Sequence, residues 1–358
     1  MIPFDDKGFE NSVDTVLKPW LKEQVKGGTF SSFDGTRIQY YSAVRKDANA
    51  VIVMVHGFAE FFGKFHETAY NFWESGYTVF FIEQRGHGGS GRTVPVSDVV
   101  DVAGFSNYVD DLKCFLDKVV IPQTPGVQTR LSIRVSSDNR GDINISFADS
   151  GEENAKIPAK NLILYAHSMG GCVGTLFLER YPEYFCAAVL SSPMLKMTFG
   201  KTPLWQVKLM LAPGMLPGMG KKPVPVMNAF NPDNPNFEAS GASSMPRFMY
   251  QFRMRKDPSN GGIYTMNRGT YRWVRAALKA TEIVSKREKY IRIPLLVCQA
   301  GKDAYVDNEG QNEIAANARY VKLVQFPESE HEIYAGDPES LRKYYRELLR
   351  FFDKASMI

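Results

Sequence analysis

The chain has 358 residues, of which 44% are hydrophobic and 23% are charged, and its formal net charge is +4 at pH 7. This composition is typical of a folded globular protein and excludes a chain that is disordered throughout. No run of about 18 apolar residues occurs, and the acidic N-terminal stretch has no apolar segment, so we expect neither a membrane span nor a secretory signal.

Four cysteines are scattered in apolar surroundings without the Cys-x-x-Cys spacing of redox or zinc sites: Cys114, Cys172, Cys186 and Cys298. We expect four reduced thiols that are buried as small apolar side chains. This indicates a reducing compartment, and we expect a cytoplasmic protein. The pattern implies no metal site.

The first half of the chain alternates strand-like and helical patterns. Residues 29–43 predict a hairpin that turns at an Asp-Gly pair. Residues 49–57 and 77–84 are continuous apolar runs, as expected of strands that are buried on both faces. Residues 105–120 place their apolar side chains on one face of a helix.

The second half continues this alternation. Further strands are predicted at 161–166, 186–192, 294–301 and 320–326, and a helix closes the chain near 338–352. Strands that alternate with helices form mainly parallel sheets with helices on both faces. The sequence therefore predicts an α/β fold.

Two segments interrupt the alternation. In residues 121–158, apolar residues alternate with polar ones around a turn-rich stretch, which predicts an added β-hairpin. Residues 195–289 contain a Pro- and Gly-rich stretch that suits neither a strand nor a long helix, and a clear helix follows it. We interpret this second segment as an inserted cap. The core then comprises residues 1–194 and 290–358.

The stretch LILYAHSMGGCVGTLFL, residues 162–178, begins as a buried strand and ends as a helix, with Ser168 at the join. A serine hydroxyl is a poor nucleophile until a base removes its proton, and a sharp strand-to-helix turn holds it where a histidine can reach it. Such a turn needs small residues two positions before and after the serine, here Ala166 and Gly170. The helix N-terminus also suits an anionic intermediate. A serine that only caps the helix is the alternative.

A nucleophile of this kind takes its acid and its histidine from later strand ends, in the chain order Ser, Asp, His. His331 is the single histidine after Ser168, and it follows the last predicted strand. Asp303 directly follows the strand before that one. Asp307 competes for the same role, but Asp303 lies nearer to the strand end. We therefore predict that Ser168, Asp303 and His331 are catalytic.

Five blocks carry a resemblance to a known family: VHGFAEFFGKF (55–65), EQRGHGGSG (83–91), AHSMGG (166–171), AGKDAYVDN (300–308) and SEHEI (329–333). The chain resembles serine hydrolases of the α/β-hydrolase fold, in the monoacylglycerol lipase and bacterial lysophospholipase L2 group. The blocks cover the core, whereas in the cap only GTYRWVRAALKA resembles the family. One departure is Ala166, where the general G-x-S-x-G pattern has glycine.

The resemblance implies an oxyanion hole formed by the backbone N–H groups of Phe58, after the His56-Gly57 turn, and of Met169, after the nucleophile. Backbone donors are rigid and point at charge that develops only in the transition state. Glu60 and His56 either brace that loop or are satisfied structural polar groups.

The sequence GHGGSG at 86–91 also fits the glycine pattern of dinucleotide-binding sites. Such a fingerprint must open a helix at once, so that the helix N-terminus meets the pyrophosphate. Here a polar and β-branched stretch with Pro95 follows, so we exclude a nucleotide site.

The segment 195–289 carries the information on the substrate. Ten of the 14 methionines lie between Met194 and Met266, where they either bind an unbranched acyl chain or fill the core of the cap. The segment holds 16 Lys and Arg against 5 Asp and Glu, a net charge of +11. This favours phosphate-bearing lipids and peripheral contact with an anionic membrane surface, and charge that is merely solvated is the alternative. No nucleic-acid-binding motif accompanies the charge, so we expect no nucleic-acid partner.

The predicted head-group contacts lie in the stretch RFMYQFRMRK: Arg247, Arg253, Arg255 and Lys256. The sequence thus predicts a serine carboxylester hydrolase that cleaves a single-acyl lipid, preferably a lysophospholipid, through an acyl-enzyme and without a metal or organic cofactor. We expect it in the cytoplasm, in peripheral contact with the inner membrane face. The alternatives are a monoacylglycerol lipase or short-chain esterase, an aminopeptidase of the same fold, and a non-catalytic binding protein.

Overall fold

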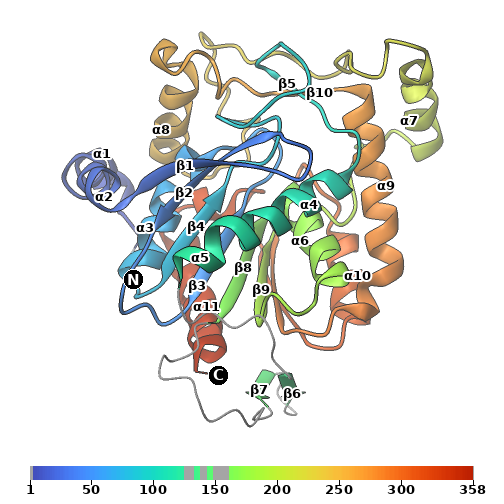
Figure 1. The fold of residues 1–358 in the computed structure, drawn as a ribbon. Helices are drawn as coiled ribbons and strands as arrows, with labels where there is room; N and C mark the ends of the chain where they lie inside the picture. The colour runs from blue at the N-terminus through green and yellow to red at the C-terminus, as the bar shows by residue number, and fades with distance from the viewer. Residues whose placement is uncertain (1–2, 125–132, 138–142, 148–160, 358) are drawn as a thin grey trace.

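The computed structural model describes residues 3–124, 133–137, 143–147 and 161–357. Its centre is an eight-stranded sheet in the order β1-β2-β4-β3-β8-β9-β11-β12 (Figure 1). The strands are β1 (Lys26–Ser31), β2 (Arg37–Ala43), β3 (Val51–Val55), β4 (Thr78–Ile82), β8 (Leu162–His167), β9 (Ala187–Ser191), β11 (Leu295–Ala300) and β12 (Val321–Phe326). β1, β2 and β4 pair antiparallel, and all other neighbours pair parallel. This confirms the predicted α/β fold with a mainly parallel sheet.

Helices cover both faces of the sheet, and two hydrophobic cores result. The covering helices are α3 (His66–Glu74), α4 (Phe105–Phe115), α6 (Met169–Arg180), α10 (Asn308–Asn317) and α11 (Pro338–Ser356). Val51 and Val53 of β3 belong to the core that includes α4, α6 and α10, whereas Ile52 belongs to the core that includes α3 and α11. Successive residues of a strand point to opposite faces, so a strand between two cores must be apolar throughout.

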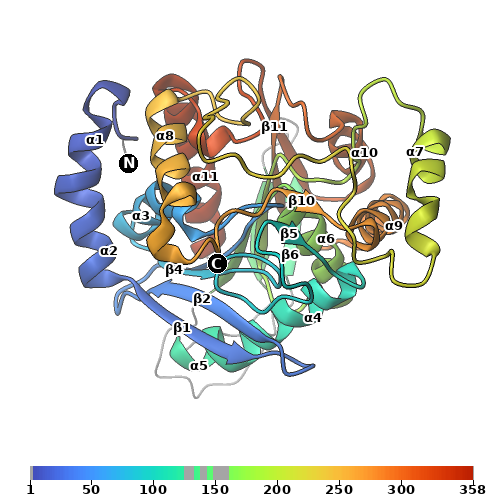
Figure 2. The ribbon, with the colours of Figure 1, turned by 90° about the horizontal axis from the view of Figure 1, so that it is seen from above.

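The N-terminal residues form helical structure that the sequence analysis did not predict. It consists of α1 (Phe9–Ser12), the π-helical η2 (Val13–Leu17) and α2 (Lys18–Gln24). Phe9 and Trp20 are buried in the core under α3 and α11. Figure 2 shows these helices beside α3 and α8. The N-terminal segment is therefore an integral part of the fold.

The segment 195–289 lies over the sheet and along one side of it (Figures 1 and 2). Its elements are α7 (Leu204–Leu211), η5 (Ala212–Met215), α8 (Met245–Lys256), η6 (Pro258–Asn260), β10 (Arg268–Gly269), α9 (Tyr271–Arg287) and η7 (Glu288–Tyr290). Thr270 caps α9 by accepting from the N–H of Trp273 at 3.0 Å, and α9 packs against α4 and α6. β10 pairs with β5 (Val99–Val100), which ties the segment to the core.

The excursion at 121–158 contains the antiparallel strands β6 (Ile133–Ser137) and β7 (Ile143–Phe147), which agrees with the predicted hairpin. Most other residues of the excursion lie outside the described part of the chain. The remaining short helical elements are η1 (Asp6–Gly8), η3 (Phe62–Phe65), η4 (Leu116–Val120), α5 (Ile121–Gln123) and η8 (Ile333–Ala335).

The four cysteines form no disulfide, and three are buried as predicted, whereas Cys114 is half-buried. No helix among the described residues is long and apolar enough to cross a bilayer.

Candidate active site

Ser168 lies at the turn between β8 and the N-terminus of α6, at φ 52° and ψ −120°. A positive φ is strained for a residue with a Cβ, so the surrounding packing must hold it. This packing leaves no room for side chains. A Cβ on Gly170 would lie 2.3 Å from the carbonyl oxygen of Val55, and one on Gly174 would lie 2.8 Å from Cδ2 of Leu164. The small residues of the turn are therefore required by the close approach of helix and strands.

His331 and Asp303 reach Ser168 from loops after the last two strands. Nε2 of His331 lies 2.8 Å from Oγ of Ser168, and its Nδ1 lies 2.7 Å from Oδ2 of Asp303. Oδ1 of Asp303 accepts from the N–H groups of Tyr305 and Val306. Burial raises the pKa of Asp303, but the hydrogen bonds from His331 and the two N–H groups outweigh burial, so this pKa lies below its ordinary value. Asp303 is therefore ionised at neutral pH and fixes the proton of His331 on Nδ1.

Asp307, the competing acid, has a different role. It caps α10 by accepting from the N–H of Glu309 at 3.0 Å, and it lies 3.4 Å from Nζ of Lys196. The structure thus brings Ser168, His331 and Asp303 into one hydrogen-bonded chain and leaves Asp307 outside it.

The loop after β3 lies directly against the nucleophile. A Cβ on Gly57 would lie 2.8 Å from the Cβ of Ser168. Among the described residues, the N–H of Phe58 donates to no group. Met169 is the first residue of α6, so its N–H has no acceptor within the helix. Both N–H groups are available to an oxyanion beside Ser168.

His56 braces this loop through both ring nitrogens. Its Nε2 accepts from the N–H of Gln84 at 2.9 Å, so Nδ1 carries the proton and donates to the carbonyl of Gly57 at 2.7 Å. Burial lowers the pKa of His56 to about 4, and the ring is neutral. Of the two roles left open for His56 by the sequence, the structure favours the brace.

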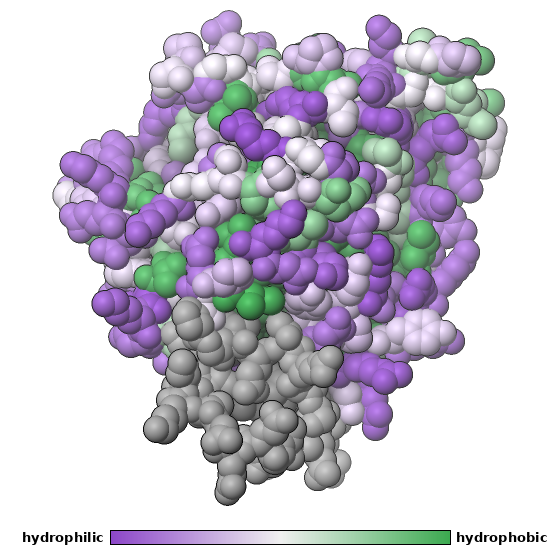
Figure 3. All heavy atoms as spheres, in the orientation of Figure 1, coloured by the Kyte–Doolittle hydropathy of each residue, from purple (hydrophilic) through white to green (hydrophobic). Residues whose placement is uncertain are grey.

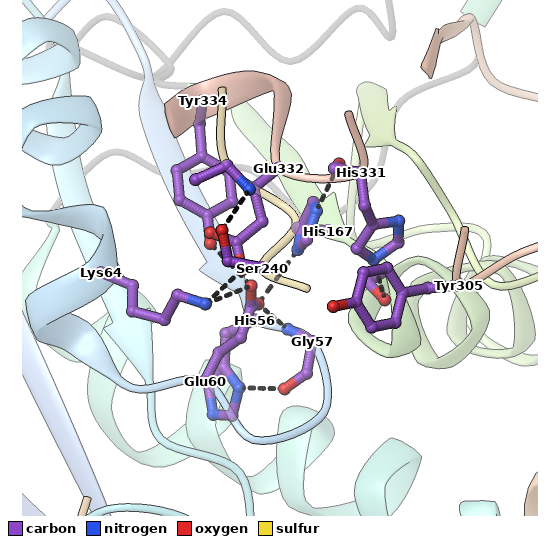
Figure 4. Close-up of polar contacts among 12 residues, drawn as sticks. His56, Gly57, Glu60, Lys64, His167, Ser240, Tyr305, His331, Glu332 and Tyr334 are labelled. Carbon is purple, nitrogen blue, oxygen red and sulfur yellow. Dashed lines mark hydrogen bonds and ion pairs between the residues drawn. The ribbon is translucent and has the colours of Figure 1, made fainter. Parts of the chain in front are cut away.

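Glu60 is buried where the loop after β3, the strand β8 and the loop of His331 meet (Figure 4). Its Oε2 accepts from the N–H of Gly57 and lies 3.0 Å from Nδ1 of His167, and its Oε1 accepts from the hydroxyl of Tyr334 at 2.7 Å. Nε2 of His167 lies 3.3 Å from the carbonyl oxygen of His331. Since both ring nitrogens of His167 face acceptors, both carry protons, and the ring is an imidazolium.

The pKa directions agree with this assignment. Burial alone would lower the pKa of His167, but the charge and hydrogen bond of Glu60 raise it. Burial raises the pKa of Glu60, but His167 and Lys64 outweigh burial and lower it. Lys64 also pairs with Glu332, the residue after His331. Two cations and two anions are thus balanced in one buried cluster that links the loop after β3, the end of β8 and the loop of His331.

The chain that leads into α8 crosses the loop of His331. The N–H of Glu332 donates to the carbonyl of Gly241 at 2.7 Å, and the hydroxyl of Tyr305 donates to the carbonyl of Ala239 at 2.6 Å. A Cβ on Gly241 would lie 3.1 Å from the Cβ of His331. The segment 195–289 therefore supports the position of the histidine from above.

Sequence analysis assigned no role to His167, Lys64, Glu332 or Tyr334. His167 carries one usable signal, its place beside the nucleophile. The others carry none, because their partners come from distant parts of the chain: Lys64 and Glu332 are 268 positions apart.

The structure contradicts the prediction that Arg247 contacts a lipid head group. Arg247 is buried, and its Nε and Nη2 bind the carboxylate of Glu67 at 2.7 and 2.8 Å. Its other N–H groups bind Asp6, Ser244 and the carbonyl of Phe4. Arg247 therefore fastens α8 to α3 and the N-terminal segment, and it has no N–H group left for a phosphate.

Arg253 and Lys256 are exposed on α8. Arg253 pairs with Glu10 of α1, and Nζ of Lys256 lies 5.8 Å from the ring centre of Phe252. Within the described part of the chain, neither side chain contacts a residue around Ser168.

Arg255 differs from its neighbours on α8. Its Nε donates to the carbonyl of Tyr264, its Nη2 donates to the carbonyl of Met266 and to Asn267, and its guanidinium lies 4.1 Å from the ring centre of Phe230. Among the described residues it forms no ion pair, and its Nη1 has no acceptor. Two N–H bonds of a half-buried cation are therefore free.

Arg255 also interacts with the loop of His331. Burial lowers the pKa of Arg255 to about 10, and the charges of Glu332 and Tyr305 oppose this shift. The ring of Tyr305 lies 5.1 Å from the ring of His331. Arg255 is thus a cation at neutral pH. The two groups whose charges act on it, Glu332 and Tyr305, belong to the loops around His331.

Comparison with known families matches residues 46–133 and 128–339 to the family described as serine aminopeptidase, S33. The chain is 29% identical over 300 residues to the probable lysophospholipase L2 of Haemophilus influenzae, covering 83% of this chain and 80% of that protein. It is 24% identical over 317 residues to the monoacylglycerol lipase of Mycolicibacterium smegmatis, covering 87% and 91%. A solved soluble variant of the Saccharomyces cerevisiae monoglyceride lipase superposes with a TM-score of 0.65 at 15% identity, covering 92% and 94%. Similarity at that identity shows the α/β-hydrolase fold.

The geometry predicts unequal roles for the two acids. Asp303→Asn should lower kcat by roughly 10³- to 10⁴-fold, because His331 then loses the acceptor that fixes its tautomer. Asp307→Asn is the matched control and should cost less than about tenfold, since it affects only a helix cap. Steady-state hydrolysis of a soluble aryl ester measures both. A larger loss in the Asp307 variant would contradict the assignment.

The buried cluster predicts a pH-dependent contribution to stability. The pair of Glu60 and His167 is fully charged from above the ordinary Glu pKa of 4.5 to the ordinary His pKa of 6.5, and its contribution is lost as the pH rises through the raised pKa of His167. Glu60→Gln should therefore cost about 3 to 5 kcal/mol of unfolding free energy near pH 6 and less at alkaline pH.

Chemical denaturation over a pH series checks this prediction. Tyr334→Phe is the control, because it removes one hydrogen bond to Glu60 but leaves the charge pair, so it should cost only about 1 kcal/mol. A Glu60→Gln penalty that stays constant as the pH rises would show that His167 is not charged.

Proposed function

The chain belongs to the serine aminopeptidase S33 family and has the α/β-hydrolase fold, and on this premise we propose that it hydrolyses the carboxylic ester of a single-acyl lipid. The observation that carries the proposal is the hydrogen-bonded chain from Ser168 through His331 to Asp303, beside two free N–H groups. The relatives named lysophospholipase L2 and monoacylglycerol lipase support a lipid ester as the substrate class.

In the proposed reaction, Ser168 Oγ attacks the ester carbonyl carbon while Nε2 of His331 takes its proton. The negative charge moves to the carbonyl oxygen, where the N–H groups of Phe58 and Met169 bind it, each worth roughly 3 kcal/mol in the transition state. The C–O bond then breaks, and His331 gives its proton to the leaving alcohol. Asp303 stabilises the imidazolium of His331 between these two proton transfers. An acyl-enzyme remains.

Water then completes the cycle. His331 takes a proton from the water as the water oxygen attacks the acyl carbon, and the same two N–H groups bind the second oxyanion. Collapse releases the fatty acid and returns the proton to Ser168 Oγ. The products are one fatty acid and one deacylated alcohol for each water consumed.

The family description makes an aminopeptidase the nearest alternative. An aminopeptidase must hold a protonated amine beside the scissile bond and needs an unneutralised acid for it. Here Glu332 is already paired with Lys64, so it is not free to bind an amine. Glu330, on the other side of His331, forms no salt bridge among the described residues, and its charge acts on Tyr305. The free N–H bonds of Arg255 favour an anionic substrate, whereas Glu330 is the acid that an aminopeptidase would use for the amine.

Arg255 supports a lysophospholipid over a monoacylglycerol. A phosphate diester is an acceptor that matches a guanidinium with free N–H bonds, whereas a glycerol head group offers only hydroxyls. Of the four basic residues predicted to contact the head group, we retain Arg255 alone. Monoacylglycerol lipase activity is the alternative that its substitution tests.

We also retain two further interpretations as proposals. Residues 195–289 act as a cap over the α/β core, and the protein is cytoplasmic with peripheral contact to the inner membrane face. The cap's basic character supports this contact.

The proposed nucleophile predicts a covalent label. A fluorophosphonate probe should label Ser168 alone, because its hydroxyl is the one paired with a histidine–carboxylate chain. Ser168→Ala should abolish both labelling and turnover and leave the melting temperature close to that of the wild type. Mass spectrometry of the labelled peptide locates the site. An active Ala variant, or a label on another residue, is incompatible with the mechanism.

The head-group proposal predicts a substrate-selective loss. Arg255→Gln should lower kcat/KM for lysophospholipids by about tenfold and leave monoacylglycerol hydrolysis nearly unchanged, since a charge-assisted hydrogen bond contributes about 1.5 to 3 kcal/mol before screening. Arg253→Gln, an exposed arginine on the same helix, is the control and should change neither. Both substrates are measured below their critical micelle concentrations. Equal losses on both substrates would remove Arg255 from head-group recognition.

A further inference from the structure

The helix α7 and the turn after it expose an unusual density of large apolar side chains. Single exposed apolar residues are normal, but a contiguous group marks an interaction surface. Within 13 residues, six large apolar side chains are exposed: Leu204, Trp205, Leu209, Met210, Met215 and Leu216. Trp205 is 65% exposed and Met215 is 70% exposed. We call this group of six the α7 face.

The α7 face lies at the edge of the molecule. Figures 1 and 2 show α7 standing out beside α9, on the side away from the N-terminal helices. Figure 3 shows hydrophobic residues gathered at the same place, at the upper right of that view. Val207 and Leu211 of α7 are buried and hold the helix on the molecule. One side of the helix thus packs against the rest of the protein, and the other side is exposed to solvent.

The chain segment that carries the α7 face is basic, whereas the acids near it belong to other elements: Glu282, Asp307 and Glu313 line the cavity beside α7, and Glu282 interacts with Lys208. No Asp or Glu occurs between Glu183 and Asp233, whereas five lysines do: Lys196, Lys201, Lys208, Lys221 and Lys222. Lys196 pairs with Asp307 and Glu309. In the described part of the chain, the other four lysines form no ion pair. An apolar group with a tryptophan and surrounding lysines is typical of a helix that lies in the interface of an anionic bilayer.

The α7 face also adjoins a cavity of about 920 Å³ between α7, α9 and the chain after β9. Leu204, Leu211 and Met215 line it, and so does Leu195. Leu195 follows Met194, whose N–H donates to the carbonyl of Ser168 at 2.8 Å. A lipid surface on the α7 face would therefore lie beside this cavity.

We propose that the α7 face binds the surface of an anionic phospholipid bilayer, with Trp205 and Leu209 inserted and the four unpaired lysines at the head groups. The inference deepens the proposed function, on which its role in lipid hydrolysis rests. A second copy of the chain is a poorer occupant, because a symmetric contact would bring the lysines of this segment close to their own copies.

The test uses the full-length Ser168→Ala protein, so that vesicles are not degraded, and measures cosedimentation with vesicles of phosphatidylcholine alone and of phosphatidylcholine with phosphatidylglycerol at roughly 7:3. We expect binding to the anionic vesicles only. Trp205→Ser with Leu209→Ser should weaken it at least about tenfold, and Lys221→Gln with Lys222→Gln roughly 20-fold, since each lysine near an anionic surface adds about fivefold. Val44→Ser, an exposed apolar residue after β2, is the matched control and should bind normally.

Two further measurements keep the outcomes distinct. The same substitutions in active protein should leave hydrolysis of a monomeric aryl ester within about twofold, because Trp205 and Leu209 do not line the cavity. Absence of vesicle binding in a protein that still hydrolyses lipid esters would overturn the α7 inference alone. Vesicle binding without any esterase activity would overturn the proposed function alone. Equal binding to both vesicle types, or sedimentation of a dimer that Trp205→Ser disrupts, would also overturn the inference.

Discussion

The backbone of Ser168 is held at a positive φ, and the rest of the candidate site is arranged around that strain. Such a conformation costs about 1 to 3 kcal/mol for a residue with a Cβ, so it persists only where neighbouring contacts determine it. The N–H of Ser168 donates to the carbonyl of Ser191, and its own carbonyl accepts from the N–H groups of Gly171 and Met194. Because Gly170 packs against the backbone of β3, the turn cannot move toward that strand. The hydroxyl is thereby fixed relative to the sheet before any substrate arrives.

For the proposed mechanism, a rigid Ser168 is useful only if His331 and the N–H groups of Phe58 and Met169 are equally fixed, and the buried charges couple their positions. Glu60 binds the loop of Phe58 through Gly57, and it binds the loop of His331 through His167 and Tyr334. Burying two ion pairs is expensive, and apolar residues of the same volume often give a more stable protein. The advantage here is orientation, because a charged network has few satisfied arrangements, whereas apolar packing tolerates many.

The sequence predicts those parts of the fold and site that depend on local pattern. Buried parallel strands appear as continuous apolar runs, and the places of Ser168, Asp303 and His331 follow from their position just after such runs. Contacts between distant segments leave no such pattern. Arg247 and Arg255 lie on one helix in the same basic stretch. Arg247 binds Glu67 and Asp6, whereas Arg255 keeps free N–H groups. Asp6, one of the partners of Arg247, lies in the N-terminal helical segment, which the sequence marks by no motif.

The same contrast changes what the charge of the segment 195–289 means. Seven of its 16 basic residues pair with acids: Lys196, Arg247, Arg253, Arg268, Arg272, Lys286 and Arg287. Those seven fix the segment 195–289 to the rest of the chain or stabilise its helices, and they contribute little to the field outside. The remaining nine form no ion pair within the described part of the chain, and four of them lie between residues 201 and 222, where the chain has no acid. Net charge counted along a sequence therefore overstates how evenly residues 195–289 attract anions. Four of the nine basic residues without an ion pair among the described residues lie on α7 and its flanks, and Arg255 instead interacts with Glu332 and Tyr305.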